Sequence, residues 1–169
     1  TWGRPLDSYS RSGEAAMGLV APTPILPRLR LRKEPHELER MRQACGISAE
    51  AHELARQMTR PGMNEAEVQA AIEAHFRARG ARGPAYGSIV AGGDNACVLH
   101  YTANTAPLQD GDLLLIDAGC SLEDYYNGDI TRTFPVNGCF SGEQRELYAL
   151  VLEAQEAAVE TVQPQGTAE

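Results

Sequence analysis

Two aspartates flank the most strand-like apolar runs of this chain of 169 residues. Asp117 follows the run 113–116, and Asp129 precedes the run 130–134. A carboxylate at the end of a buried strand loses its hydration, and an unpaired buried charge costs several kcal/mol or more. No lysine lies nearby in the sequence to pair with either carboxylate. Each aspartate is therefore expected to meet a cation, a set of hydrogen-bond donors or a proton.

The alternation of side chains along the two runs places the aspartates on defined faces. Successive strand residues point to opposite faces, so Leu115 and Asp117 share one face of the first run. By the same rule, Asp129 and Thr131 share one face of the second run. The polar and glycine residues between the runs are typical of a hairpin connection longer than a tight turn. Antiparallel pairing of the two runs would bring both carboxylates to one place.

Two such carboxylates repel each other unless a proton or divalent cations bridge them. Hard oxygen ligands suit manganese, magnesium or zinc, so the spacing indicates a metal site. The alternative from the spacing alone is an exposed hairpin whose aspartates accept hydrogen bonds from backbone amides. Both interpretations stay open at this point, because perturbed carboxylates are often purely structural.

His100 lies upstream of the hairpin and is a candidate third member of the site. It falls in the segment 97–101, which is predicted to form a short apolar strand after a turn at 92–95. A histidine in such a place is more often a hydrogen-bonded core residue than a catalyst. The remaining histidines fall in charged helical segments, are expected to be solvated or half-buried, and are assigned no chemistry: His36, His52 and His75.

Three blocks in order carry a specific family signature: Ile89–Tyr101, Asp112–Gly119 and Gly128–Gly138. They resemble bacterial aminopeptidase P, the Xaa-Pro aminopeptidases of the pita-bread metallopeptidase family. The resemblance extends from about Leu31 to the last residue. It implies an α+β fold, namely the first half of a pita-bread (creatinase/aminopeptidase-like) fold, in which helices cover an antiparallel sheet.

The resemblance also implies a role for individual residues. Asp117 matches a ligand of one metal ion, and Asp129 matches a ligand that bridges two ions. His100 matches a histidine that contacts substrate or shuttles a proton near the scissile bond. Tyr86 matches a tyrosine that hydrogen-bonds the bridging aspartate, and Thr131 lies where a supporting hydroxyl is expected. Such outer partners orient the ligands of a metal and tune its properties.

The implied activity is the metal-dependent removal of the amino-terminal residue from peptides with proline at the second position. The implied cofactors are two divalent ions, most often manganese, with zinc or cobalt as alternatives. A related enzyme, an Xaa-Pro dipeptidase (prolidase), is an alternative, although the sequence around Thr131 is more similar to that of aminopeptidase P. A second alternative is a non-catalytic pita-bread binding or assembly module.

Family members complete the site with one histidine and two glutamates from the second half of the domain, which this sequence lacks. Residues 1–33 are interpreted as a linker or the tail of a missing amino-terminal domain, and residues 34–169 as the amino-terminal half of the catalytic domain. The phrase 60–67 begins again at 163–169, as a two-fold pseudo-repeat predicts, with Thr167 as the cap of a further helix. We expect the isolated chain to be inactive, to expose an apolar face, and to associate with itself or with a complementary carboxyl-terminal half.

Three helices are predicted around these strands. The first opens at Glu34 and Pro35, because proline is tolerated in a first turn. The other two begin with capping boxes, Asn64 with Glu67 and Ser141 with Gln144, and the second helix ends near Gly80. The predicted apolar stripes are Leu38, Met41, Cys45, Leu54 and Met58 in the first helix, Val68, Ile72 and Phe76 in the second, and Leu147, Val151, Ala154 and Ala158 in the third. They are interpreted as core rather than ligand surface, and they are expected to include faces that would pack on the absent second half of the domain.

Composition excludes several other classes of protein. A net charge of −8 argues against nucleic-acid binding, and no apolar stretch is long enough to span a bilayer. No signal peptide is visible, so a cytoplasmic location is the default expectation. The four cysteines lack zinc-like spacing and are interpreted as reduced core thiols: Cys45, Cys97, Cys120 and Cys139.

Overall fold

A computed structural model describes residues 25–163 of the chain. Contacts divide it into two compact units, residues 1–36 and residues 37–169. In the first unit, the described part contains α2 (Leu26–Leu31), a short exposed helix. The interpretation of residues 1–33 as a linker or the tail of a missing amino-terminal domain stays a prediction, to which the structure adds this short helix. Residues 1–24, and the repeated phrase from residue 164 on with Thr167, lie outside the described range.

The second unit is built from helices and short strands in alternation. In chain order these are α3 (Pro35–Met58, which begins in the first unit), α4 (Glu65–Ala78), β1 (Gly83–Pro84), β2 (Ile89–Gly92), the 3-10 helix η1 (Gly93–Cys97), β3 (Leu113–Ala118), β4 (Cys120–Ser121), β5 (Ile130–Pro135) and α5 (Gly142–Glu160). Its α+β class is as predicted.

The strands β2, β3 and β5 form an antiparallel sheet with β3 in the centre. Asp117 of β3 pairs with Ile89 of β2 on one side and with Thr131 of β5 on the other. A second small sheet pairs β1 with β4. The predicted hairpin between the two apolar runs is thus confirmed, and its register places the two aspartates at the same end.

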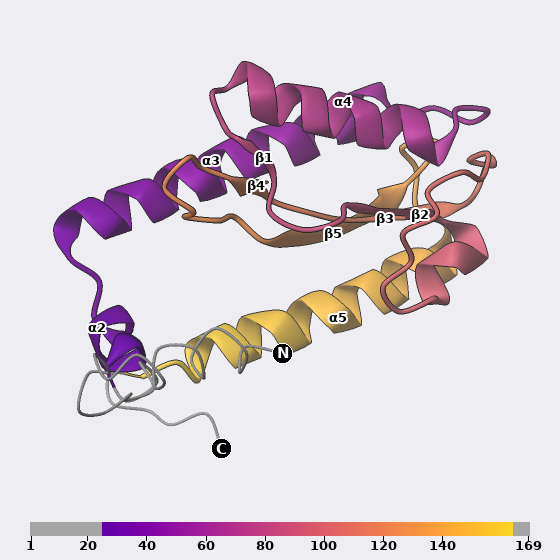
Figure 1. Ribbon diagram of the computed structural model, residues 1–169. Coiled ribbons are helices and arrows are strands. Elements are labelled where there is room, and N and C mark those ends of the chain that lie inside the picture. The colour runs from indigo at the N-terminus through magenta and orange to yellow at the C-terminus, as the bar shows by residue number, and fades with distance from the viewer. Residues whose placement is uncertain (1–24, 164–169) are drawn as a thin grey trace, which may run out of the picture. The chain divides into compact units, whose positions relative to one another are not determined.

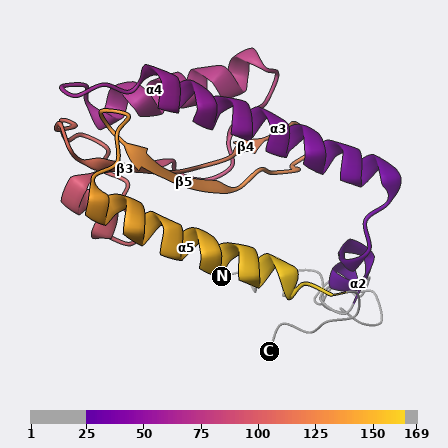
Figure 2. The same ribbon diagram turned by 180° about the vertical axis from the view of Figure 1, so that it is seen from behind.

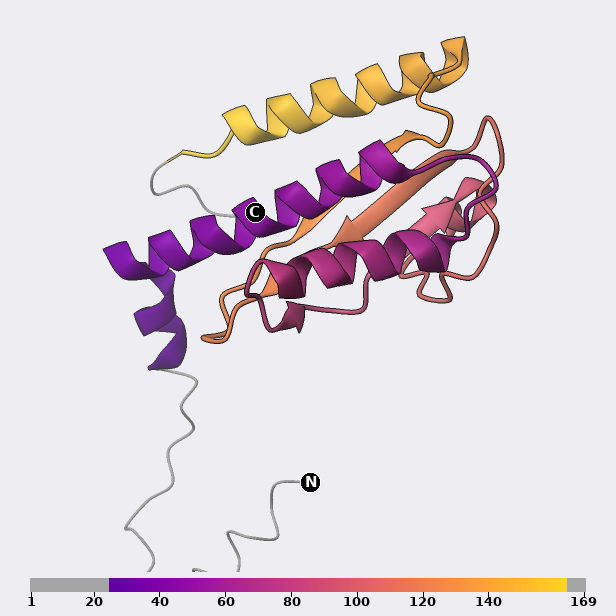
Figure 3. The ribbon, with the colours of Figure 1, turned by 90° about the horizontal axis from the view of Figure 1, so that it is seen from above.

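The helices α3 and α4 cover one face of the sheet, and α5 lies on the side of the opposite face (Figures 1 and 2). Seen from above, α3 and α4 run side by side over the strands (Figure 3). The core lies between these two helices and the sheet. Its largest fully buried side chains include Phe76 and Ile72 of α4 with Leu114 and Ile116 of β3.

The face that α3 turns to the core differs from the predicted stripe. Leu38 and Cys45 are exposed, and Met41, Leu54 and Met58 are only half-buried. The buried residues of the helix are Ala44, Ile47, Ser48, Ala51, His52 and Ala55. The stripe was wrong because α3 packs against the backbone of the hairpin around Ala44 and Ser48: a Cβ at Gly128 would lie 2.2 Å from the Ser48 hydroxyl oxygen and 2.9 Å from the Ala44 carbonyl oxygen.

Both predicted capping boxes are present, at the start of α4 and of α5. Val68, Ile72 and Phe76 are fully buried as predicted, and α4 is followed by Gly80 at a φ of +83°. In α5, by contrast, no residue is buried. The apolar stripe of α5 therefore does not join the core of the described residues, as expected of a face that would pack on the second half of the domain, and Leu147 and Val151 are 59% and 61% exposed.

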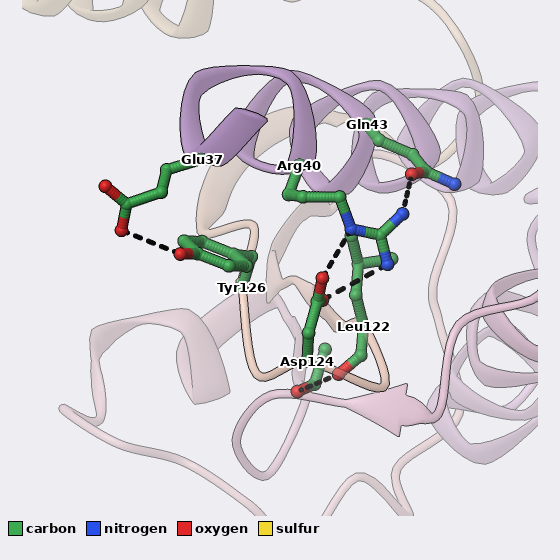
Figure 4. A network of polar contacts seen from close by, with 7 residues as sticks. Glu37, Arg40, Gln43, Leu122, Asp124 and Tyr126 are labelled. Atoms are coloured by element: carbon green, nitrogen blue, oxygen red, sulfur yellow. Dashed lines mark hydrogen bonds and ion pairs between the residues drawn. The ribbon is translucent and has the colours of Figure 1, made fainter. Parts of the chain in front are cut away.

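Polar contacts tie the end of the hairpin to the start of α3 (Figure 4). The Arg40 guanidinium binds both carboxylate oxygens of Asp124, at 2.5 and 3.2 Å. The Tyr126 hydroxyl donates to Glu37 Oε1 at 2.7 Å. Because residues 122–128 connect β4 to Asp129, these contacts help to fix the position of the second aspartate.

Two expectations from composition can be compared with the described residues. All four cysteines are free, but only Cys120 is buried, so the interpretation as core thiols is wrong for Cys45, Cys97 and Cys139. Those three lie on a helix surface or in turns, where a thiol is not needed for packing. Among residues 25–163, no helix has the length and apolar character needed to cross a membrane.

Candidate metal centre

Tyr86, Asp117 and Asp129 meet at one end of the sheet. The Tyr86 hydroxyl oxygen lies 2.6 Å from Asp117 Oδ1 and 2.8 Å from Asp129 Oδ1. The three side chains come from the segment after β1, from β3 and from the residue before β5. Two carboxylates far apart in the sequence therefore share one hydroxyl group.

One hydroxyl cannot satisfy both carboxylates, because it carries a single proton. Burial, the hydrogen bonds to Asp117 and Asp129 and their negative charges raise the pKa of Tyr86 far above its ordinary value. The phenol therefore keeps its proton and donates it to one carboxylate at a time. The other carboxylate then faces an oxygen lone pair at hydrogen-bond distance, a repulsive arrangement that a bound cation relieves. This donor set suits a hard divalent ion.

Two glycines allow the aspartates to converge. A Cβ built on Gly119 would lie 1.8 Å from the Gly128 carbonyl oxygen, far inside any contact that real side chains make. Gly128 in turn has no room for a side chain against Ser48. The Ser48 hydroxyl donates to the Ala44 carbonyl at 2.8 Å and accepts from the Cys120 amide at 3.0 Å. The backbone on both sides of the site is thus held directly against α3.

His52 supports the hairpin from the core side, which sequence reasoning missed. It was expected to be solvated or half-buried, but only 6% of it is exposed. Its Nε2 lies 3.0 Å from the Ala118 carbonyl oxygen and must donate, because a carbonyl only accepts. Its Nδ1 is buried and has no hydrogen-bond partner among the described residues. The signal available in the sequence was its i+4 spacing from Ser48, on the face of α3 that carries Ala44 and Ala55.

Burial lowers the pKa of His52, and the nearby Arg132 charge acts in the same direction. The Ala118 carbonyl and the Asp117 charge oppose this effect without reversing it. His52 is therefore a neutral imidazole at neutral pH. It fixes the backbone next to Asp117 without adding a positive charge that would compete with a metal ion.

Thr131 lies beside Asp117 in the sheet register. The residue is exposed, and its hydroxyl makes no hydrogen bond to another residue in the range 25–163. The structure thus places Thr131 next to the aspartates but does not show the supporting contact expected of it.

His100 departs from its predicted setting. The segment 97–101 was predicted as a strand, but residues 93–97 form η1 and a turn follows it. His100 is exposed and has a left-handed backbone with a φ of 56°. The predicted turn is present within η1, but the chain does not extend after it, because Asn95 and Tyr101 both bind the Glu65 carboxylate and this holds the intervening residues in a turn. Within the described chain, no hydrogen bond or ion pair joins His100 to Tyr86 or to either aspartate.

Two carboxylates do not complete a metal site. In the part of the chain that the structure describes, no group of three or more His, Cys, Asp or Glu residues is arranged to hold a metal ion. Asp117 is half-buried and Asp129 is exposed, so both carboxylates remain accessible. A site of the usual coordination number thus needs further ligands.

Comparison with known proteins gives this arrangement a context. Residues 39–169 match the model of Metallopeptidase family M24. The chain is 51% identical over 164 residues to the Xaa-Pro aminopeptidase of Haemophilus influenzae, covering 97% of this chain and 37% of that protein. It is 48% identical over 141 residues to the Xaa-Pro aminopeptidase of Escherichia coli, covering 83% and 32% respectively.

Solved structures are similar over nearly the whole chain. Aminopeptidase PepP of Pseudomonas aeruginosa superposes with a TM-score of 0.85 at 48% identity, covering 96% of this chain and 37% of that one. A variant of Escherichia coli aminopeptidase P in complex with substrate superposes with a TM-score of 0.84 at 43% identity, covering 95% of this chain and 37% of that one. The chain thus has the fold of the matching part of these enzymes, and it spans little more than a third of their length.

Proposed function

The chain belongs to metallopeptidase family M24, and from this premise we propose that it carries the first part of the catalytic site of an Xaa-Pro aminopeptidase. The whole protein would remove the amino-terminal residue from peptides whose second residue is proline. The two relatives of known name support this activity, since both are Xaa-Pro aminopeptidases. The single observation that carries the proposal is the convergence of Asp117 and Asp129 on the Tyr86 hydroxyl.

Each residue of the centre has a proposed task. Asp117 would bind one ion and Asp129 would bridge two ions, which removes the repulsion between the carboxylates. Tyr86 would orient Asp129 through its hydroxyl, and Thr131 would support the same end of the sheet. His100, which is exposed, would contact the substrate or carry a proton near the scissile bond.

The proposed cofactors are two divalent ions. Manganese is the first candidate, with zinc and cobalt as alternatives, and one related structure is a zinc-substituted Escherichia coli aminopeptidase P in complex with product. A pair of such ions, when bound, lowers the pKa of a water molecule and polarises the scissile carbonyl. The chain's own contribution is to hold two carboxylates at a fixed spacing and to keep the Tyr86 phenol protonated beside them.

The missing ligands would come from a complementary carboxyl-terminal half. We propose that residues 1–33 are a connecting segment, that residues 34–169 form the amino-terminal half of the catalytic domain, and that one histidine and two glutamates of the other half complete the centre. Without that half the chain would be inactive and would tend to associate with itself, because α5 exposes a row of large apolar side chains. The proposed location is the cytoplasm, and the proposed partner is a peptide rather than a nucleic acid, given the net charge of −8.

The test measures release of the amino-terminal residue from an Xaa-Pro-Yaa tripeptide in the presence of manganese. The chain is assayed alone and together with the carboxyl-terminal half of Escherichia coli aminopeptidase P, with Asp129→Asn as the control. We expect no turnover by the chain alone, turnover by the pair, and loss of that turnover in the control. Activity that survives Asp129→Asn would refute the metal centre, and a pair without turnover would favour a binding module.

Two further substrates test the specificity. An Xaa-Ala-Yaa tripeptide should not be cleaved, because the proposal requires proline at the second position. An Xaa-Pro dipeptide should be cleaved poorly. Cleavage of the dipeptide alone would identify a prolidase instead.

A further inference from the structure

A buried carboxylate outside the metal centre holds the segment that carries His100. Glu65, the first residue of α4, is fully buried and has no positively charged partner in the described range. Its Oε1 accepts from the Gly92 amide at 2.8 Å and from Asn95 Nδ2 at 3.0 Å. Its Oε2 accepts from the Tyr101 hydroxyl at 2.8 Å and from the Ala106 amide at 2.9 Å.

These contacts form a closed ring around the turn that bears His100. Asn95 Nδ2 also lies 3.1 Å from the Tyr101 hydroxyl oxygen, so both side chains bind each other as well as Glu65. His100 lies between them in the chain, and it makes no hydrogen bond of its own to another described residue. Its backbone is left-handed, which is uncommon for a residue other than glycine.

Other contacts anchor the flanks of this segment, but not its middle. The buried Asn104 side chain accepts from the Val90 amide and donates to the Ser88 carbonyl. At the far end, backbone hydrogen bonds join Leu108 to Gly62 and Met63. The side-chain contacts that hold residues 95–101 to the core of the molecule are those with Glu65.

A carboxylate is required at this position because four donors point at it. An amide in its place would direct an NH₂ group at two of them, and neither the Gly92 nor the Ala106 backbone N–H can turn into an acceptor. A shorter acid would not reach all four. The use of a fully buried charge at this point indicates that the conformation of the turn matters.

We infer that Glu65 is a positioning residue for His100: it orders residues 93–103 and thereby fixes the turn that carries the histidine. The inference rests on the proposed function for the role of His100. It adds a residue that touches neither substrate nor metal ligand to those on which turnover depends.

Hydrogen exchange on the chain itself tests the ordering. Glu65→Gln should accelerate amide exchange in residues 93–103 while β3 exchanges as before. Glu67→Gln is the matched control, because Glu67 lies two positions further along α4, is exposed, and binds the Asn64 amide through an oxygen that glutamine retains. If Glu65→Gln does not fold, Tyr101→Phe removes one of the four contacts and should give a smaller change at the same amides. Unchanged exchange in the folded variants would overturn the inference.

A double-mutant cycle tests the link to His100. The complemented enzyme is this chain together with the carboxyl-terminal half of Escherichia coli aminopeptidase P. In it, Glu65→Gln should lower kcat by about tenfold or more. When His100 is already replaced by alanine, the same substitution should lower kcat by less than about twofold. Manganese affinity should stay the same in all variants. Equal losses in both backgrounds would show a merely structural role and would contradict the inference. A complemented enzyme without turnover would refute the proposed function, and the exchange measurement would still decide whether Glu65 orders the turn.

Discussion

The two faces of the central sheet differ although the same strands build them. Along β3, Leu114, Ile116 and Ala118 are fully buried under α3 and α4, whereas Leu115 and Asp117 on the other face stay half-exposed. The covered face is part of a fully buried core. The open face carries the candidate metal centre, and α5 on its side has no buried residue. One face of the strand thus supplies packing, and the other holds the residues of the candidate metal centre.

The largest expected effect lies on the covered face. Phe76→Ala should lower the free energy of unfolding by about 3–5 kcal/mol, because it leaves a cavity where a fully buried ring was packed. Chemical denaturation followed by circular dichroism measures this value. A loss below about 1 kcal/mol would mean that the covered face is not a tightly packed core.

The close approach of Gly119 and Gly128 within the hairpin ranks next. Gly119→Ala should lower the free energy of unfolding by about 1–3 kcal/mol or more, because the added methyl group would overlap the Gly128 carbonyl. It should also displace Asp129 and weaken manganese binding in the complemented enzyme. Gly142→Ala is the matched control, since no atom lies within 4 Å of its added methyl group. Similar stability of the two variants would contradict the close approach.

The buried Glu65 predicts a pH dependence. Burial opposes its charged form, but hydrogen bonds from Gly92, Asn95, Ala106 and Tyr101 outweigh burial and lower the pKa of Glu65. The charged Glu65 side chain therefore contributes its full stabilisation of the folded chain above the pKa of an unfolded glutamate, about 4.3. This contribution is lost as the pH falls through the lower pKa that Glu65 has in the folded chain.

Glu65→Gln should accordingly lower the free energy of unfolding by about 1–3 kcal/mol at neutral pH. Below about pH 4, the difference in this free energy between the variant and the unaltered chain should shrink. Denaturation curves at several pH values measure it. A difference that stays constant down to pH 2 would show that the charge of Glu65 is not the cause.

A smaller effect, a gain in stability rather than a loss, is expected for a substitution on the open face of the sheet. Asp129→Asn in the metal-free chain should leave stability unchanged or raise it by up to about 1 kcal/mol, because one of two facing charges is removed and an NH₂ donor is added. Thermal unfolding in the presence of a chelator checks this result. A marked loss of stability would mean that the carboxylates serve the fold rather than a metal.

The smallest effect is expected on α5. Leu150 is 63% exposed, so Leu150→Ala should change the stability of the isolated chain by less than about 0.5 kcal/mol. The same substitution should weaken association with a complementary half, which light scattering can follow. A large loss in the isolated chain would show that α5 already packs on a core.

The parts of the fold that follow from local chemistry were predictable. The alternation of side chains between the two faces of the strand around Leu115 predicted the hairpin. The capping boxes at Asn64 and Ser141 predicted where two helices begin. These signals depend on residues that are close in the sequence or share a strand face. The convergence of Asp117 and Asp129 at one end of the hairpin followed from the same alternation.

The parts that depend on distant contacts were not predictable. The buried face of α3 consists of small and polar residues such as Ser48 and His52, because the hairpin backbone lies against it. The turn around His100 is held by Glu65, which is 35 positions away along the chain. The i+4 spacing of Ser48 and His52 was the one local signal of the first contact, and the second contact leaves no periodic pattern in the sequence.

The most direct test of the central claim is a manganese titration followed by electron paramagnetic resonance. The chain alone should bind the ion weakly, because Asp117 and Asp129 are its only proposed ligands. The complemented enzyme should bind two ions tightly, and Asp129→Asn should abolish that tight binding. Tight binding by the chain alone, or binding that is unaffected by Asp129→Asn, would contradict the account.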